Sequence, residues 1–317
     1  MKSIRRLIGP AIILQLGCAL SVCATPQTDD APFVVVLGVA QDAGVPQAGC
    51  KRACCTAAWL DFSRRRKVTS LAIVDPQTSE RWLIDTTPDF PEQLQILNEL
   101  TSSASPATIN GIFLTHAHIG HYTGLMHLGR EVMGAEEVPV YAMPRMRDFL
   151  RNNGPWQQLV RLRNIVLRAL QNDSTIVLNA RLKLTPMLVP HRDEYSETVG
   201  FRIAGPQQTV LFIPDIDKWE KWERRIADEI AGVDVAYLDG TFYAGDEIPG
   251  RNMAEIPHPF IVESLARLSS LPAKEKMKVR FIHCNHTNPV LSQESQAYGH
   301  VRALGFGFAQ EREKVKL

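Results

Sequence analysis

The sequence lacks an excess of charge of one sign, a long apolar span, and any repeated or low-complexity segment. Lys and Arg number 35 and Asp and Glu 34, a balance that offers nothing to attract the negative backbone of a nucleic acid. With 45% hydrophobic and 22% charged residues, the composition excludes a disordered chain. No linker divides the 317 residues. We therefore expect one large domain whose partner is a small molecule rather than a nucleic acid, with a homodimer as one option for its assembly.

Residues 1–24 have the pattern of an export signal. A basic start, MKSIRR, precedes the apolar run LIGPAIILQLGCALSV, and the segment ends in VCA, which suits a cleavage site. A membrane anchor is the alternative, but the run is shorter than the roughly 20 residues that span a bilayer and contains Pro10 and Gln15. The valine before Cys23 disfavours a lipoprotein. We expect a cleaved signal peptide, a folded domain over 25–317, a periplasmic or secreted location, and no stable membrane insertion.

Short apolar or β-branched runs bounded by turn residues predict strands in both halves of the chain. The predicted strands cover 33–40, 70–75, 81–85, 111–115, 138–143, a hairpin within 174–190, 198–205, 209–215, 233–240 and 278–284. Helices are expected over 122–133 and 144–150, after Asp217, and from Pro259. The two sets of strands, each with helices outside, indicate an α/β domain in which four layers stack as an αββα sandwich.

Three histidines lie close together in the stretch FLTHAHIGHYTGLMHL, residues 113–128. His116 and His118 follow an apolar strand two positions apart, so extended backbone sends both side chains to the same side. His121 opens the expected helix. Imidazole is a common ligand of zinc and similar metals. A lone histidine is more often structural, but three in one strand-to-helix loop favour a metal site.

Further apolar runs also end in residues that can bind a metal. These residues are His191, Asp215, Asp239 and His283. Strand ends that carry polar side chains on one rim of a sandwich would bring them together. The start of a loop or a helix cap would explain either aspartate alone. It would not explain the two histidines, so the set extends the candidate metal site.

The order and spacing of these residues resemble the metallo-β-lactamase superfamily. Its pattern is His-x-His-x-Asp-His, then a lone histidine, a bridging aspartate and a last histidine. The resemblance covers essentially the whole chain after residue 24. The resemblance implies the four-layer αββα fold. It implies that Asp85, in the segment LID, orients the histidine loop. It also implies a first metal site with four ligands, His116, His118, His191 and Asp215.

Position 120 departs from that pattern. The superfamily has an aspartate there, a ligand of the second metal, whereas this chain has Gly120. The second site would keep His121, His283 and a share of Asp215. We therefore expect one tightly bound catalytic metal and a weak second one, and we expect an aspartate introduced at position 120 to strengthen the second site. The alternative is that Gly120 simply begins a helix in a protein that needs one metal.

Several segments are similar to the pyrroloquinoline-quinone biosynthesis protein B group of that superfamily. They are GVPQAGCKRACC, TPDFPEQ, LTHAHIGHYTGLMHL, LDGTFYAGDE and IHCNHTNPVL. The group in turn resembles a cyclic phosphodiesterase of phosphonate breakdown that carries a second, cysteine-rich metal site. The similarity therefore implies either a hydrolase or a part in quinone biosynthesis.

A separate cluster consists of Cys50, Cys54 and Cys55. In an exported protein disulfides are the default expectation, and Cys284 could pair with the odd cysteine. The alternative is a structural zinc site completed by His286. If the chain after the last strand stays extended, His283 and His286 point to opposite sides and serve one site each. The phosphodiesterase resemblance supports the zinc site.

Weaker signals come from two other segments. His258, in EIPHPF, lies between prolines that fix the backbone direction, so it could face the substrate or lie on the surface. Asp42 and Gln47 follow the first strand in a turn that could face the metal. Turn chemistry alone would also explain that segment.

These residues favour a metal-dependent hydrolase for a small phosphodiester, lactone or amide. A bound metal polarises the substrate oxygen and lowers the pKa of its water toward roughly 7. Asp215 would hold that water, and His121 or Asp239 would assist proton transfer. Zinc is expected, and iron or manganese also suit histidine and carboxylate ligands. The alternatives are an iron-dependent oxygenation of a quinone precursor and a non-catalytic carrier of a cofactor.

Overall fold

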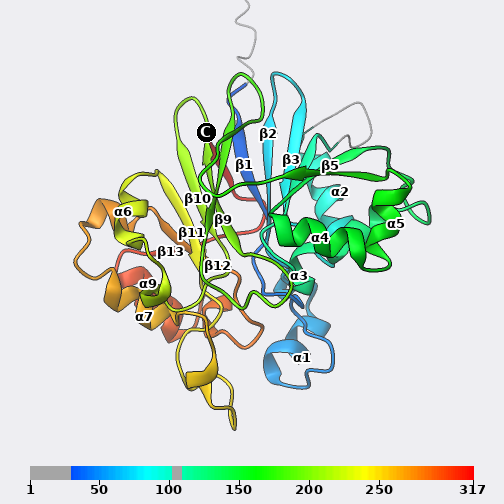
Figure 1. The fold of residues 1–317 in the computed structure, drawn as a ribbon. Coiled ribbons are helices and arrows are strands. Elements are labelled where there is room, and N and C mark those ends of the chain that lie inside the picture. Colours follow the sequence, from blue (N-terminus) through cyan, green and yellow to red (C-terminus); the bar gives the residue numbers. More distant parts are fainter. Residues whose placement is uncertain (1–29, 102–108) are drawn as a thin grey trace, which may run out of the picture.

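The computed structural model describes residues 30–101 and 109–317; the expected signal peptide lies outside these ranges. Two β-sheets pack face to face and helices cover the outer side of each (Figure 1). This is the predicted four-layer αββα sandwich. Within the described ranges, no helix is both long and apolar enough to cross a bilayer.

The two sheets have seven strands each and share a topology. The first sheet has the order β14 (Lys314–Lys316), β1 (Phe33–Gly38), β2 (Ser70–Asp75), β3 (Glu80–Ile84), β4 (Gly111–Phe113), β5 (Val138–Ala142), β6 (Ile165–Ala169). The second has the order β13 (Gly307–Phe308), β12 (Val279–Ile282), β11 (Val235–Asp239), β10 (Thr209–Ile213), β9 (Val199–Ala204), β8 (Lys183–Leu188), β7 (Ile176–Val177). In each sheet antiparallel pairing gives way to parallel pairing, from β3 onward in the first and from β10 onward in the second.

Helices flank both sheets. Near the first sheet lie α2 (Phe90–Thr101), α4 (Pro144–Asn152) and α5 (Trp156–Arg161). Against the second lie α6 (Ile226–Ala231), α7 (Ile261–Arg267) and α9 (Gln296–Ala303). The remaining helices are α1 (Ala53–Leu60), α3 (Ile119–Tyr122) and α8 (Ala273–Lys276). Helices α1 and α3 lie at the same end of the sandwich (Figure 1).

Alternation along the strands lets each sheet pack on both of its faces. Val34 and Val36 of β1 point into the layer between the sheets. Their neighbours Val35 and Leu37 pack among the residues of α2 and α4. Successive strand residues point to opposite sides, so a run such as FVVVLG, apolar at every position, is what a strand covered on both faces requires.

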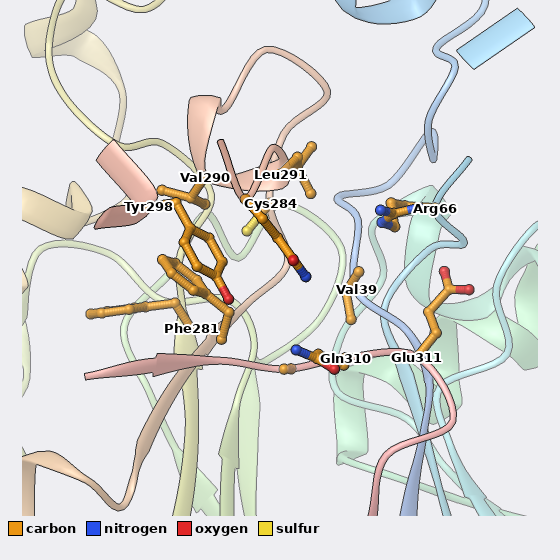
Figure 2. A pocket seen from close by; sticks show the side chains of 12 residues that line it. Val39, Arg66, Phe281, Cys284, Val290, Leu291, Tyr298, Gln310 and Glu311 are labelled. Atoms are coloured by element: carbon orange, nitrogen blue, oxygen red, sulfur yellow. The ribbon is translucent and has the colours of Figure 1, made fainter. Parts of the chain in front are cut away.

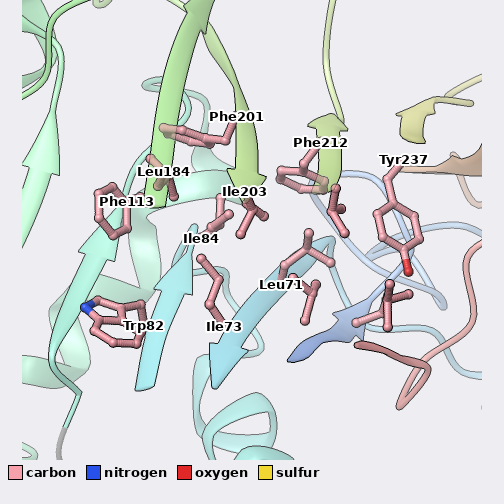
Figure 3. Packing of buried hydrophobic residues seen from close by; sticks show 14 of the residues in the cluster. Leu71, Ile73, Trp82, Ile84, Phe113, Leu184, Phe201, Ile203, Phe212 and Tyr237 are labelled. Atoms are coloured by element: carbon pink, nitrogen blue, oxygen red, sulfur yellow. The ribbon is translucent and has the colours of Figure 1, made fainter. Parts of the chain in front are cut away.

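The layer between the sheets is built from large apolar side chains (Figure 3). Phe113 of β4 stacks on Tyr141 with ring centroids 4.4 Å apart and meets the edge of Phe201 from the opposite sheet at 6.0 Å. Phe113 and Phe201 are fully buried. Burial of such a side chain contributes about 1.5–3 kcal/mol. This layer therefore holds the two sheets together, and with them the strand ends of each sheet.

The helix expected over 122–133 is wrong. The chain forms the single turn α3 and then the 3-10 helix η2 (Thr123–Leu128), and Val132 is exposed. The cause is tertiary: Thr86 N donates to His121 O and Gly124 N to Thr86 O. These bonds dock the segment onto the loop after β3, which interrupts the regular helical ladder.

Candidate metal centre

The candidate ligands gather on one rim because their strands run in the same direction. In each sheet the parallel strands expose their carboxyl ends at one edge, where ligand sites of α/β proteins commonly form. Asp85 follows β3, the histidine cluster follows β4, and His191 follows β8. Asp215 follows β10, Asp239 ends β11 and His283 follows β12. The repeated strand-then-ligand pattern in the sequence reflects this geometry.

The first group consists of His116, His118, His191 and Asp215, whose ligand atoms all lie within 4.8 Å of one another. His116 Nε2 lies 2.8 Å from His118 Nδ1 and 3.3 Å from Asp215 Oδ2. His191 Nε2 lies 3.2 Å from Asp215 Oδ1. Nitrogen and oxygen ligands at 2.0–2.2 Å from one zinc lie roughly 3.3–3.5 Å apart in a tetrahedron. The group therefore fits one metal ion with only small adjustments.

The charge states of this group suit a cation. Burial holds the pKa of His116 well below its ordinary value, with a further contribution from His121, so the imidazole is neutral and its nitrogen lone pair is free. Burial would raise the pKa of Asp215, but His191 and His258 outweigh it and hold that pKa well below the ordinary value. A neutral imidazole beside a carboxylate is the state that a metal requires of its ligands.

Asp42, His121 and His283 form a second group whose ligand atoms also lie within 4.8 Å of one another. Asp42 Oδ1, His121 Nε2 and His283 Nε2 are buried, and no described residue forms a hydrogen bond with them. Orphaned buried polar atoms cost free energy, and three that converge fit a cation. Burial opposes the charged form of His121, but Asp85 and Asp42 raise its pKa to about 10. The two carboxylates thus stabilise a positive charge here, and a metal ion bound by His121 Nε2 would replace the proton on that atom.

This arrangement corrects the expectation for position 120. A Cβ atom added to Gly120 would lie 2.3 Å from Asp42 Oδ1 and 2.5 Å from Asp42 Cα. The space at Gly120 is filled by Asp42, which reaches the site from the turn after β1. An aspartate at position 120 therefore has no gap to fill, and the premise that the second group lacks a carboxylate is wrong.

Buried hydrogen bonds orient the histidines from behind. Asp85 accepts from Thr115 N and pairs with His121 Nδ1 at 2.7 Å, which leaves His121 Nε2 facing the rim. This is the place that the resemblance gave to Asp85. Its backbone has φ +64°, a left-handed conformation that costs energy in a non-glycine residue.

Asp217 plays the corresponding part for His191, and the sequence reading did not single it out. Its Oδ1 lies 3.2 Å from His191 Nδ1, and Lys221 Nζ donates to its Oδ2. Burial opposes ionisation, but His191 and Lys221 lower the pKa of Asp217 to about 2. A carboxylate two residues after a candidate ligand, in PDID, was the available signal.

Replacing Asp217 with Asn should weaken the first metal site. Loss of a carboxylate behind a metal-bound histidine typically lowers affinity by about tenfold to a hundredfold. Competition between the protein and a chelator for Zn²⁺ measures the change. Asp148→Asn, at a carboxylate that is 69% exposed, should leave the affinity unchanged. An equal affinity in the two variants would mean that His191 needs no orienting partner.

Asp239 and His258 form a third group with Asp215. His258 Nδ1 lies 2.8 Å from Asp239 Oδ2 and 3.1 Å from Asp215 Oδ1. His258 is buried, so the surface alternative for it is wrong. Asp239 also accepts from Ile216 N and Thr241 N. Because these bonds occupy the Asp239 carboxylate, Asp239 is better placed to orient His258 and to fix the loops at Ile216 and Thr241 than to transfer a proton directly.

The cysteine cluster forms as well. Cys50, Cys54, Cys55 and His286 have ligand atoms within 4.8 Å of one another. Sγ of Cys54 and of Cys55 are 4.0 Å apart and lie 3.6 and 3.3 Å from His286 Nδ1. Tetrahedral zinc with sulfur at 2.3 Å and nitrogen at 2.0 Å implies separations of roughly 3.5–3.8 Å. All four described cysteines, Cys284 included, are free.

The two histidines after β12 separate for a reason other than the expected one. The chain does not stay extended: His283 has φ +66°. This turn puts His283 in the second group while His286 reaches the cysteines. Cys284, between them, forms backbone bonds in both directions with Val39 and Gln41. The expectation of one histidine per site holds, but the extended backbone behind it is wrong.

A pocket near Cys284 is separate from the metal centre. It is lined by residues such as Val39, Phe281 and Tyr298, and by no histidine or aspartate. Figure 2 shows Arg66 and Glu311 on one side of it and Tyr298 on the other. It therefore shares no ligand with the three histidine and aspartate groups.

Comparison with known proteins places this centre in a family. The model of the family described as "Beta-lactamase superfamily domain" matches residues 80–284. Coenzyme PQQ synthesis protein B of Methylorubrum extorquens (strain PA1) is 27% identical over 308 residues, which cover 88% of this chain and 97% of that protein.

Solved structures agree. Zn²⁺-bound PqqB from Methylobacterium extorquens superposes with a TM-score of 0.75 at 25% identity and covers 90% of this chain and 100% of that one. A diphosphatase from the PhnP family, with a TM-score of 0.61 at 23% identity over 90% of this chain and 97% of that one, shares the fold. The chain belongs to the metallo-β-lactamase superfamily.

Proposed function

We propose that the protein is a hydrolase that uses metal-activated water on a small phosphodiester, lactone or amide. The observation that carries the proposal is the first group, three histidines and one aspartate whose ligand atoms all lie within 4.8 Å of one another. Zinc is the proposed metal, since a related protein was solved with Zn²⁺ bound. When bound, such an ion supplies a polarised substrate oxygen and an acidified water.

The residues around the metal site have separable tasks. Asp215, whose pKa is held well below its ordinary value, would help to hold the metal and would accept a hydrogen bond from the water. Burial opposes the charged form of His258, but Asp239 and Asp215 raise its pKa well above the ordinary value. Held between these two carboxylates at 2.8 and 3.1 Å, His258 is our candidate for the general acid that protonates the leaving group. Asp239 fixes its ring.

A role in pyrroloquinoline-quinone biosynthesis is the second candidate. It is favoured by the similarity to coenzyme PQQ synthesis protein B over nearly that protein's whole length. In that case the same residues would hold iron for oxygenation of a precursor, or would bind a cofactor without turnover. We also propose export through residues 1–24, which MKSIRR and the apolar run after it support.

Turnover by the metal-loaded protein tests the hydrolase. Protein loaded with Zn²⁺ or Mn²⁺ is assayed with phosphodiester, diphosphate, lactone and amide probes, beside His118→Ala. That variant should lose the activity, because a site with one histidine fewer holds its metal loosely. The matched control, His300→Ala, alters an exposed histidine on α9 and should retain activity. Full metal occupancy without turnover on any probe would reject the hydrolase and favour the quinone candidate, to be tested by precursor binding and by oxygen uptake with iron.

A further inference from the structure

We propose that Asp42 is a ligand of a second metal ion, together with His121 and His283 and beside Asp215, and that Gly120 is glycine to make room for it. The centre would then hold two metals rather than one. The proposal rests on the proposed function only in assuming a metal in the first group. It also replaces the expectation of a weak second site.

The backbone around Asp42 is fixed by the opposite sheet. After β1 the chain pairs with the segment after β12: Cys284 N donates to Val39 O, and Gln41 N donates to Cys284 O. A bridge between Ala40 and Cys284 joins the two sheets at this point. The next residue enters a turn closed by Gly44 N and Gln41 O at 2.8 Å. Asp42 is therefore held beside His283 by main-chain bonds, and its placement costs no long flexible loop.

The carboxylate of Asp42 points at the rim histidines. Asp42 Oδ1 lies 3.4 Å from His121 Nε2, and neither atom forms a hydrogen bond with a described residue. His121 Nε2 lies 3.9 Å from Asp215 Oδ2, which also faces the first group. Asp215 Oδ2 therefore faces histidines of both groups, so Asp215 could contribute to a second site as well as to the first.

Gly120 is the counterpart of Asp42. Any side chain at position 120 would meet the Asp42 backbone as well as its carboxylate, since the added Cβ would lie 2.5 Å from Cα. Contacts under 3.0 Å force something to move, and here the backbone is pinned by the bonds of Val39 and Gln41 to Cys284. The position of Asp42 therefore depends on glycine at position 120, although the two residues are far apart in the sequence.

Manganese binding tests the proposal independently of activity. Mn²⁺ prefers histidine and carboxylate over thiolate ligands, so it reports the rim and not the cysteine cluster. Metal-stripped full-length protein is titrated with Mn²⁺, and paramagnetic resonance shows whether two bound ions lie close enough to couple. The wild-type protein should bind two coupled ions. Asp42→Asn keeps the shape of the side chain and removes its charge. It should lower the affinity for the second Mn²⁺ by more than the roughly hundredfold that is typical when a residue behind a ligand is changed.

Matched variants separate the proposed role from a general effect. Gly120→Ala should lower the affinity for the second Mn²⁺ as Asp42→Asn does. The double variant should bind this ion no more weakly than either single variant, since both changes act through the carboxylate of Asp42. Asp148→Asn and Gly299→Ala, at an exposed carboxylate and at a helical glycine with no atom near its added Cβ, should bind two ions. A wild-type protein that binds one Mn²⁺, or an Asp42→Asn protein that keeps two coupled ions, would overturn the proposal. Neither result depends on hydrolysis, so failure of the proposed function is recognised separately.

Discussion

Asp215→Asn should remove nearly all hydrolytic activity while the protein stays folded. The carboxylate of Asp215 lies near all three groups: 3.3 Å from His116 in the first, 3.9 Å from His121 in the second and 3.1 Å from His258 in the third. An amide of the same shape carries no negative charge and cannot accept a proton. Ligand, water-orienting group and counter-ion of the general acid are lost together, so kcat/KM should fall by more than the roughly hundredfold expected from an outer-shell change.

The measurement is kcat/KM on the most reactive probe, with metal content by elemental analysis. A thermal melt checks that the fold survives, and the Phe113 and Phe201 layer gives the reason to expect it. Asp228→Asn, at a carboxylate that is 66% exposed, is the control. If Asp215→Asn turned over at a rate near that of the control, Asp215 would be a structural residue only, and the proposed division of tasks would fail.

Cys55→Ser should lower the thermal stability of the protein strongly, while the metal content of the histidine and aspartate groups at the rim should change little. Free energy of binding at a structural zinc is folding free energy, on the order of 10 kcal/mol in small peptides. A serine hydroxyl replaces the most buried sulfur of the cluster with a poor zinc ligand. Burial raises the pKa of Cys55 to about 12, so this sulfur stays a thiol until a cation draws off its proton. In domains of 150–250 residues each kcal/mol of lost stability lowers Tm by about 2–4 °C.

Differential scanning calorimetry and zinc content give the two readouts. Cys284→Ser is the comparison, because Cys284 is buried outside the cluster and its loss should leave the zinc count unchanged. Thiols are then counted in denaturant after chelation and without reductant, on protein that begins near Thr25. Four reactive thiols support zinc; two or fewer would establish a disulfide and reject the structural zinc.

The fold was predictable because it follows from local patterns. The runs FVVVLG, and VLFI within TVLFI, are short and apolar without interruption, which is typical of a strand covered on both faces, and the residues that follow them mark the rim. What the sequence concealed is set by tertiary contacts. The helix expected after His121 is broken by bonds to Thr86, and the left-handed turn at His283 leaves no trace in residue type.

The same limit explains the error at Gly120. Along the chain, a missing carboxylate looks like a lost ligand. In space Asp42, far away in sequence, occupies that volume. The sequence did place Asp42 in a turn that could face the metal, but nothing local distinguished that from ordinary turn chemistry. Asp217 was not predicted for a similar reason, since its role follows from its contact with Nδ1 of His191, which only the folded structure shows.

The rim draws its ligands from both sheets, and this has a mechanical consequence. Asp42 and the histidine cluster follow strands of the first sheet, whereas His191, Asp215 and His283 follow strands of the second. Backbone hydrogen bonds of Cys284 to Val39 and Gln41 already join the two sheets at this edge. Metal ions held by ligands from both sheets would add further directional bonds there. Removal of the ions should then loosen the contact between the sheets more at the rim than elsewhere in the sandwich.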